Sequence, residues 1–150
     1  MMLSHDDTYR SIYNEVMADT SDTWNILLLE LGGLNSNRKS FYLKSCANAS
    51  VYFSKDILGE LSTKIKDSLY TDKLAVLLKQ IGDINGFYAG DCTDYVSSHS
   101  SELLIIKNGH LNKWIEAYSS RGSLKEVLYG KKDYAWLLDL CNYIEDIKSK

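Results

Sequence analysis

The sequence predicts an all-α fold, a single compact bundle of about seven or eight amphipathic helices that forms one domain over residues 1–150. Three observations support this prediction. The chain has no proline, although a protein with many strands and proline-punctuated loops is expected to contain several. Apolar residues recur at three- and four-residue spacing along much of the chain. Small polar residues of the kind that cap helices precede several of these segments.

The first two predicted helices lie near the N-terminus. Ser4 and Asp7 have the spacing of a capping box, and apolar residues with a helical period follow over residues 9–17. Residues 24–31 are apolar on most sides, so we expect a buried helix there. Two glycines at residues 32–33 end this helix, because glycine readily adopts the left-handed conformation that follows many helices.

Three further helices are predicted in the middle of the chain, over residues 38–53, 57–69 and 72–81. The last two have the most regular helical spacing in the sequence. Residues 82–94 contain three glycines among several aspartates and asparagines, which indicates a loop or an interrupted helix.

The C-terminal part completes the predicted bundle. Residues 102–106 form a short apolar segment with two β-branched residues, which is compatible with a strand, but a helix is the preferred interpretation. Helices over residues 110–118, 124–129 and 134–147 follow. The last of these places most of its apolar residues near one face.

No catalytic, metal or cofactor site is predicted. His5, His99 and His110 lie in different predicted elements and lack the spacing of known zinc motifs. The glycines over residues 82–90 lack the lysine and the serine or threonine of a phosphate-binding loop. Cys92 and His99 are a conceivable nucleophilic pair, but no family signature surrounds them. We therefore expect a non-enzymatic protein that needs no cofactor.

The charge of the chain argues against nucleic acid as a partner. Lys and Arg number 17 and Asp and Glu number 20, which gives a formal net charge of −3, and no basic block is present. The charge is unevenly distributed, because residues 1–34 are acidic and residues 35–80 are basic. Such an asymmetry steers charged partners.

Cysteine usage and the chain ends predict a cytoplasmic protein without a membrane anchor. Cys46, Cys92 and Cys141 are an odd number of widely spaced cysteines, which is typical of reduced thiols. Residues 1–7 lack the basic and apolar regions of a signal peptide. The chain ends in Lys-Ser-Lys at residues 148–150, and its apolar runs are far shorter than the ~18 residues of a membrane span.

Several stretches of the chain resemble sequence motifs of one protein family. Residues 108–115, Asn-Gly-His-Leu-Asn-Lys-Trp-Ile, are followed by Leu-Tyr-Gly at 128–130. Together they resemble the second homology motif of the B-cell-lymphoma-type apoptosis regulators. Residues 81–86 resemble a degraded form of the family's first motif, and residues 43–53 lie where its third motif would be. The similarity extends over residues 43–130. So divergent a chain would belong among the viral members of the family, whose sequence similarity is low.

The resemblance implies an all-helical bundle with a surface groove that sequesters the amphipathic ligand helix of a pro-apoptotic protein, as helix-in-groove binders do. It implies a groove lined by Tyr52, Leu58, Leu61, Leu74 and Leu78, with Asn85 and Gly86 at the polar end of the ligand. Where the family has an arginine that pairs with the ligand's aspartate, this chain has Phe87. Lys79 is then the first candidate for the missing cation. The leucines would serve equally well as core residues.

Two alternatives stay open from the residues alone. The chain is also compatible with a different non-enzymatic binder, such as an immunity-type protein inhibitor that uses the acidic first third. The second alternative is a small enzyme whose site is assembled only by the tertiary fold.

Overall fold

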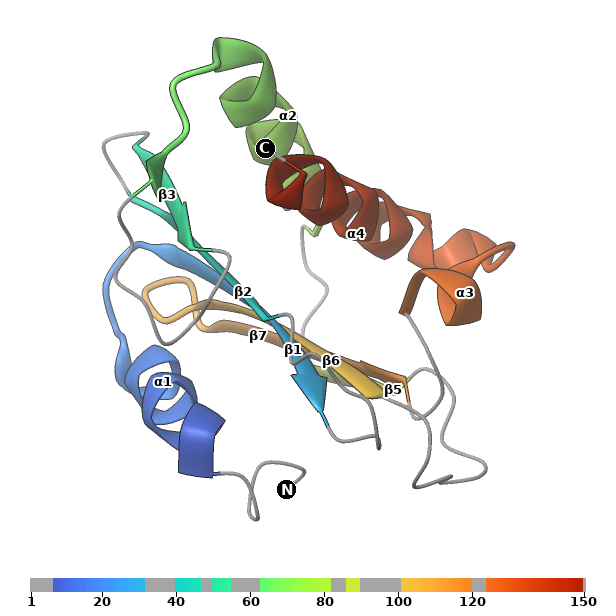
Figure 1. Cartoon of the computed structure of the whole chain (residues 1–150), viewed down its shortest axis with the longest axis horizontal. Helices are drawn as coiled ribbons and strands as arrows, with labels where there is room; N and C mark the ends of the chain where they lie inside the picture. Colours follow the sequence, from blue (N-terminus) through green and yellow to red (C-terminus); the bar gives the residue numbers. More distant parts are fainter. Residues whose placement is uncertain are drawn as a thin grey trace.

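The protein is a mixed α/β structure rather than a helical bundle. The computed structural model describes residues 7–31, 40–46, 50–54, 63–81, 86–89, 101–119 and 124–149. In these parts of the chain, a seven-stranded sheet has helices on both of its faces (Figure 1). The prediction of an all-α bundle of seven or eight helices is therefore wrong.

Groups of consecutive strands are separated by helices along the described parts of the chain. In order the elements are α1 (Asp7–Ala18), β1 (Trp24–Leu31), β2 (Phe41–Ser45), β3 (Val51–Ser54), β4 (Thr63–Lys64), α2 (Ser68–Ile81), β5 (Gly86–Ala89), β6 (Ser101–Asn108), β7 (Lys113–Ser119), α3 (Leu124–Leu128), a 3-10 turn η2 (Lys132–Tyr134) and α4 (Ala135–Lys148).

The strands are arranged in the order β4-β3-β2-β1-β6-β7-β5. The central strands β1 and β6 are antiparallel, with Asn25 opposite Lys107 and Leu31 opposite Ser101. All other neighbours are antiparallel too, except that β5 runs parallel to β7. The chain enters α2 from β4 at one edge of the sheet and later reaches β5 at the opposite edge.

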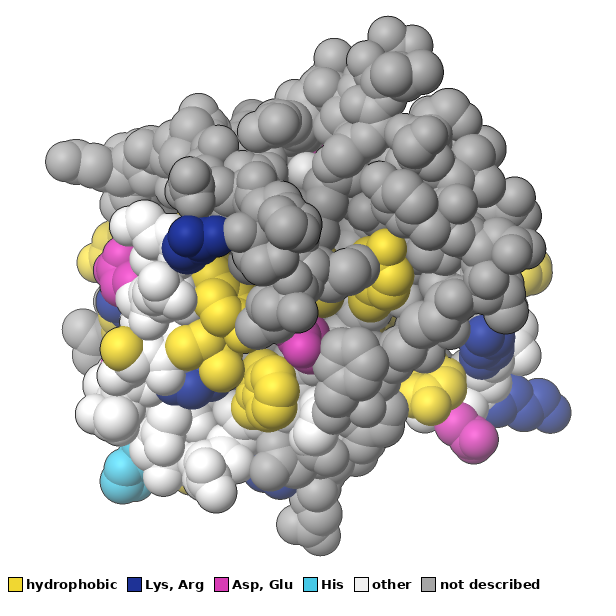
Figure 2. Space-filling view, turned by 90° about the horizontal axis from the view of Figure 1, so that it is seen from below, with side chains coloured by type: hydrophobic (Ala, Val, Ile, Leu, Met, Phe, Trp, Pro, Cys, Tyr) yellow, Lys and Arg dark blue, Asp and Glu magenta, His cyan; other side chains and the backbone are white. Residues whose placement is uncertain are grey.

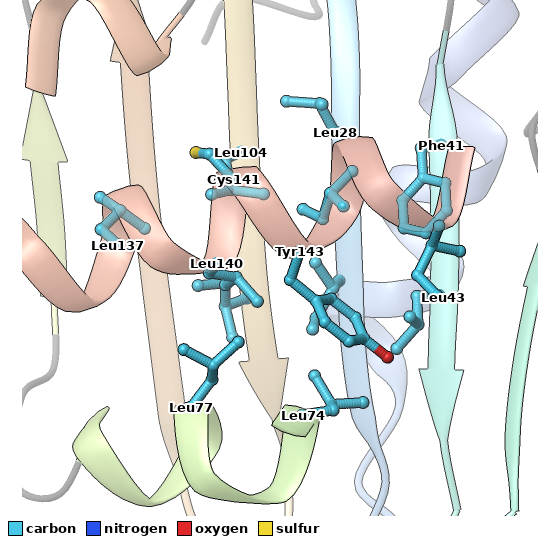
Figure 3. Close-up of a cluster of buried hydrophobic side chains, with 14 of the residues drawn as sticks. Leu28, Phe41, Leu43, Leu74, Leu77, Leu104, Leu137, Leu140, Cys141 and Tyr143 are labelled. Atoms are coloured by element: carbon cyan, nitrogen blue, oxygen red, sulfur yellow. The ribbon is translucent and has the colours of Figure 1, made fainter. Parts of the chain in front are cut away.

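The larger core lies between the sheet and the helices α2, α3 and α4 (Figure 1). Figure 3 shows side chains of α4 and α2 directed at the side chains of the central strands. The labelled residues of this cluster are Leu28, Phe41, Leu43 and Leu104 from the sheet, Leu74 and Leu77 from α2, and Leu137, Leu140, Cys141 and Tyr143 from α4.

A smaller core lies on the other face of the sheet, where α1 packs. Val16 of α1 is buried against Leu27, Leu29 and Ile105 of the two central strands. Figure 2 looks at the molecule from this side and shows some hydrophobic side chains of the described residues at the surface. Because both faces of β1 and β6 are covered, these two strands are buried on both sides.

Burial on both faces explains why β1 and β6 were predicted as helices. The residues Ile26 to Leu29 and Leu103 to Ile106 are each at most 6% exposed. A strand that is buried on both faces has a continuous apolar run, which sequence periodicity does not distinguish from a buried helix. The helices predicted over 24–31 and 102–106 are therefore strands.

The predicted helix over residues 38–53 is also wrong. The structure has two antiparallel strands, β2 and β3, with Ser45 opposite Val51. Residues 38–39 and 47–49 of the prediction lie outside the described residues. Of the predicted helix over 57–69, residues 57–62 lie outside the described residues. Within the described part, residues 63–64 form β4 and only residues 68–69 are helical.

Four predicted helices are present at nearly the predicted positions. The predictions over residues 9–17, 72–81, 124–129 and 134–147 correspond to α1, α2, α3 and α4. In the last two turns of α2 and along α4, the buried residues recur at helical spacing and face the sheet. Such one-sided burial is the pattern that hydrophobic periodicity detects.

The hairpin that joins β6 to β7 is fixed against the connection between α1 and β1. The Asn108 side chain donates a hydrogen bond to Asp22 Oδ1 (3.1 Å) and accepts one from the Leu111 N–H (3.0 Å). A Cβ atom added to Gly109 would lie 2.0 Å from the carbonyl oxygen of Asp19. The hairpin therefore stands beside the start of β1, at one end of the sheet.

Lys107 holds the C-terminal end of α1 at the same place. Its Nζ donates hydrogen bonds to the carbonyl oxygens of Asp19 (2.6 Å) and Val16 (3.1 Å). Carbonyl groups at a helix C-terminus lack partners within the helix, and a cation there also interacts favourably with the helix dipole. The segment that leads into β1 is thus fixed from two sides.

Candidate partner-binding pocket

A pocket of about 520 Å³ lies between α2 and one end of the sheet. It is formed where the first residues of β1, β3 and β7 and the last residue of β2 come together under α2. Its lining residues are Trp24, Ser45, Val51, Thr71, Asp72, Leu74, Ala75, Leu78, Lys79, Leu111 and Lys113.

The sheet contributes a row of residues that crosses three neighbouring strands. Trp24 is opposite Ser45, and Ser45 is opposite Val51. Side chains alternate between the two faces of a sheet, and Trp24 lies two residues before Ile26, a core residue of the face that α2 covers. The row therefore faces the helix, and Leu111 from the β6–β7 hairpin extends it.

The opposite wall of the pocket is one face of α2. Thr71, Leu74, Ala75 and Leu78 have the spacing of residues that lie on one side of a helix. Leu74 is 1% exposed and belongs to the core, Leu78 is partly buried, and Ala75 is exposed. The wall thus runs from the hydrophobic core to the surface, where Ala75 and Leu78 remain accessible from outside.

Three charged residues also line the pocket. Asp72 and Lys79 are exposed residues of α2, and Lys113 is the first residue of β7. Asp72 and Lys79 are seven residues apart, so they lie on the same side of α2 and are separated by roughly 10 Å along its axis. The two opposite charges are therefore at different ends of an apolar surface.

The structure brings two of the predicted groove residues into this pocket. Leu74 and Leu78 line it, and so does Lys79, which the resemblance suggested as a substitute cation. Leu74 also has the core role that the sequence left open as its alternative.

The other predicted groove residues are not part of the pocket or are not described. Tyr52 lies on β3 between two residues of the helix-side core, so it faces the other way, and Lys64 Nζ lies 5.9 Å from its ring centroid. Gly86 begins β5 opposite Ile115 and is absent from the lining. Leu58, Leu61 and Asn85 lie outside the described residues.

The motif on which the family resemblance mainly rested is not helical here. Residues 108–115 form the end of β6, a turn and the beginning of β7, and Asn112 in the turn has a φ of 55°. Asparagine is enriched in this left-handed conformation because its side chain tolerates it. The helix predicted over 110–118 is therefore a β-hairpin, and the helical geometry that the resemblance implied for this motif is wrong.

Sequence reasoning missed most of the sheet's contribution to the pocket. Trp24, Ser45 and Val51 are far apart in the sequence and meet only through strand pairing. Leu111, which is 50% exposed, was read as part of a helix. A local pattern carries no information about which strands pair, so no signal was available for these residues.

Two carboxyl groups lie away from the pocket, of which Glu102 is half-buried and Glu116 is buried. Glu102 Oε1 accepts a hydrogen bond from the Leu124 N–H at 2.7 Å, at the beginning of α3. Glu116 is 5% exposed, and its Oε1 has no hydrogen-bond partner among the described residues. Burial raises the pKa of both carboxyl groups. Glu116 is opposite Ile105, so it faces the smaller core on the α1 side.

The described residues contain no group of three or more His, Cys, Asp and Glu side chains positioned to hold a metal ion. In the same parts of the chain, no helix combines the length and apolar composition needed to span a bilayer. The sequence matches no protein-family model, and no curated protein matches it significantly.

Proposed function

We propose that this protein is a non-enzymatic binding module that accepts the apolar side chains of a partner's amphipathic segment between α2 and the end of the sheet. The observation that carries this proposal is the 520 Å³ pocket, which is lined by Trp24, Val51, Leu74, Leu78 and Leu111. Its volume is within the range of about 300–1,000 Å³ that is typical of ligand sites.

The distribution of polar groups favours a peptide segment over a compact small molecule. Small-molecule sites direct a few polar groups at one point of an apolar pocket. Here Asp72 and Lys79 stand two helical turns apart, at either end of an apolar wall. An amphipathic segment matches such an extended wall, because its apolar residues recur at a similar spacing.

This proposal does not depend on a helical bundle. The apoptosis-regulating role that the resemblance implied stays a prediction, and so do the immunity-type inhibitor and the small enzyme. We place the binding function in the cytoplasm, because Cys46 and Cys141 are free thiols and free thiols are typical of reducing compartments.

The test is a selection of displayed random 16-residue peptides on the whole protein. Binding of the enriched peptides is then measured by calorimetry to the wild type and to Leu78→Glu. A carboxylate in the wall of an apolar pocket should weaken binding at least tenfold, because it is desolvated on binding. Val76→Glu is the matched control, since Val76 is on the same helix, is 57% exposed and does not line the pocket.

A second variant distinguishes loss of binding from loss of folding. Ala75→Arg places a long side chain over the pocket from an exposed helical position, where arginine is a good helix former. Peptides that bind in the pocket should lose affinity for Ala75→Arg and keep it for Val76→Glu. The proposal fails if no peptide is enriched, or if the enriched peptides bind all three variants equally.

A further inference from the structure

We infer that the segment bound in the pocket carries an acidic residue where it meets Lys79 and a basic residue where it meets Asp72, with apolar residues between them. This inference rests on the proposed binding function and specifies the chemistry of the partner. It follows from the placement of the charges around the pocket.

The path of α2 determines which end of the pocket each charge occupies. The helix follows β4, which pairs with β3, and precedes β5, which pairs with β7. Asp72 near its beginning therefore lies toward the β3 side, and Lys79 near its end lies toward the β7 side. Lys113 at the start of β7 adds a second positive charge to the Lys79 end.

The charges of Asp72 and Lys79 are not used within the described structure. Neither residue forms a hydrogen bond or an ion pair with another described residue. Lys73, the neighbour of Asp72, differs because its Nζ lies 4.0 Å from Asp146 Oδ2 of α4. At a separation of two helical turns, Asp72 and Lys79 are also too far apart to form an ion pair with each other.

The two ends of the pocket carry opposite charges and are separated by the apolar wall. Ala75 lies between Asp72 and Lys79 on the same side of α2, and its small side chain leaves the wall open to a bound backbone. A segment whose acidic residue meets Lys79 and whose basic residue meets Asp72 is attracted at both ends of the pocket. A segment with the same sign at both ends meets repulsion at one of them.

The test uses the peptides enriched on the wild-type protein. We expect them to carry an acidic and a basic residue about two helical turns apart on their apolar side. Replacement of the peptide's acid by Gln should weaken binding to the wild type about two- to fivefold, which is typical of an exposed ion pair. The same replacement should have a clearly smaller effect on binding to Lys79→Gln, because only the charge of Lys113 then remains at that end of the pocket.

Lys73→Gln is the matched control for this double-mutant cycle. It removes a positive charge from the same helix at a position outside the pocket. The peptide's acid should therefore keep its full effect on binding to Lys73→Gln. The double variant with Asp72→Lys and Lys79→Asp exchanges the two charges of the pocket. It should bind peptides whose acidic and basic residues have both been neutralised more tightly than it binds the original peptides.

The outcomes separate this inference from the proposed function. If the peptides are blocked by Ala75→Arg but their acid shows no coupling to Lys79, the binding function stands and the charge inference is wrong. Coupling to Lys73 in place of Lys79 also overturns it. If no peptide is enriched, both the binding function and the inference fail.

Discussion

At the scale of single residues, two buried tyrosines differ in whether their hydroxyl groups have partners. Tyr143 of α4 is 0% exposed and its hydroxyl has no partner among the described residues, whereas Tyr42 of β2 donates a hydrogen bond to Asn25 Oδ1. Figure 3 shows Tyr143 between α2 and the strands, surrounded by leucines. An unsatisfied buried hydroxyl lowers stability, while a satisfied one contributes to it.

We therefore predict opposite effects for the same chemical change at these positions. Tyr143→Phe should leave the free energy of unfolding unchanged or raise it by up to about 1 kcal/mol, because it removes a desolvated hydroxyl. Tyr42→Phe should lower it by about 1–2 kcal/mol, because it leaves Asn25 without that donor. Urea denaturation of both variants checks this. Equal destabilisation by the two would contradict the assignment of partners.

The buried carboxyl of Glu116 predicts a dependence of stability on pH. Burial raises its pKa in the folded protein above the value of about 4.3 in the unfolded chain. Between these two values the folded state binds more protons than the unfolded state, so stability falls as the pH rises. The contribution is fully present below pH ~4 and is lost as the pH rises through the folded pKa.

Glu116→Gln should remove this loss. The difference in unfolding free energy, variant minus wild type, is expected to increase between pH 4 and pH 7. Urea denaturation at several pH values measures it. The change with pH is the informative quantity, because the amide alters packing equally at every pH and Glu102 is present in both proteins. Parallel stability curves would show that Glu116 is ionised in the folded protein as readily as in the unfolded chain.

At the scale of elements, the β6–β7 hairpin and the end of α1 depend on one glycine. Gly109→Ala would place a methyl group 2.0 Å from the Asp19 carbonyl oxygen and 2.7 Å from the Thr20 Cα. Both contacts are with backbone, so relief requires the two elements to separate. We predict a loss of at least about 2 kcal/mol in unfolding free energy.

Gly130→Ala is the control for this prediction. Gly130 has a φ of +78° and open space around its Cα, so alanine there introduces backbone strain of about 1 kcal/mol without a collision. The amides of α1 should also exchange hydrogen faster in Gly109→Ala, whereas Gly130→Ala should leave them unchanged. A smaller loss for Gly109→Ala than for Gly130→Ala would mean that the hairpin moves away freely.

At the scale of the whole molecule, the chain crosses the sheet from edge to edge through α2. The pocket exists because this crossing places one face of the helix above the end of the sheet. Leu74 and Leu78 were predictable as binding residues because they lie on an amphipathic helix. Trp24 and Val51 were not, since each becomes a pocket residue only when β1, β2 and β3 pair.

The sequence by itself determined the four described helices, because each buries one side and exposes the other, and this asymmetry is written in the spacing of its apolar residues. Only the tertiary structure decided that Ile26 to Leu29 and Leu103 to Ile106 are strands. Their apolar runs fit a buried helix equally well, and the choice depends on long-range backbone hydrogen bonds between β1 and β6. The pocket was decided at the same level, because residues distant in the sequence line it together.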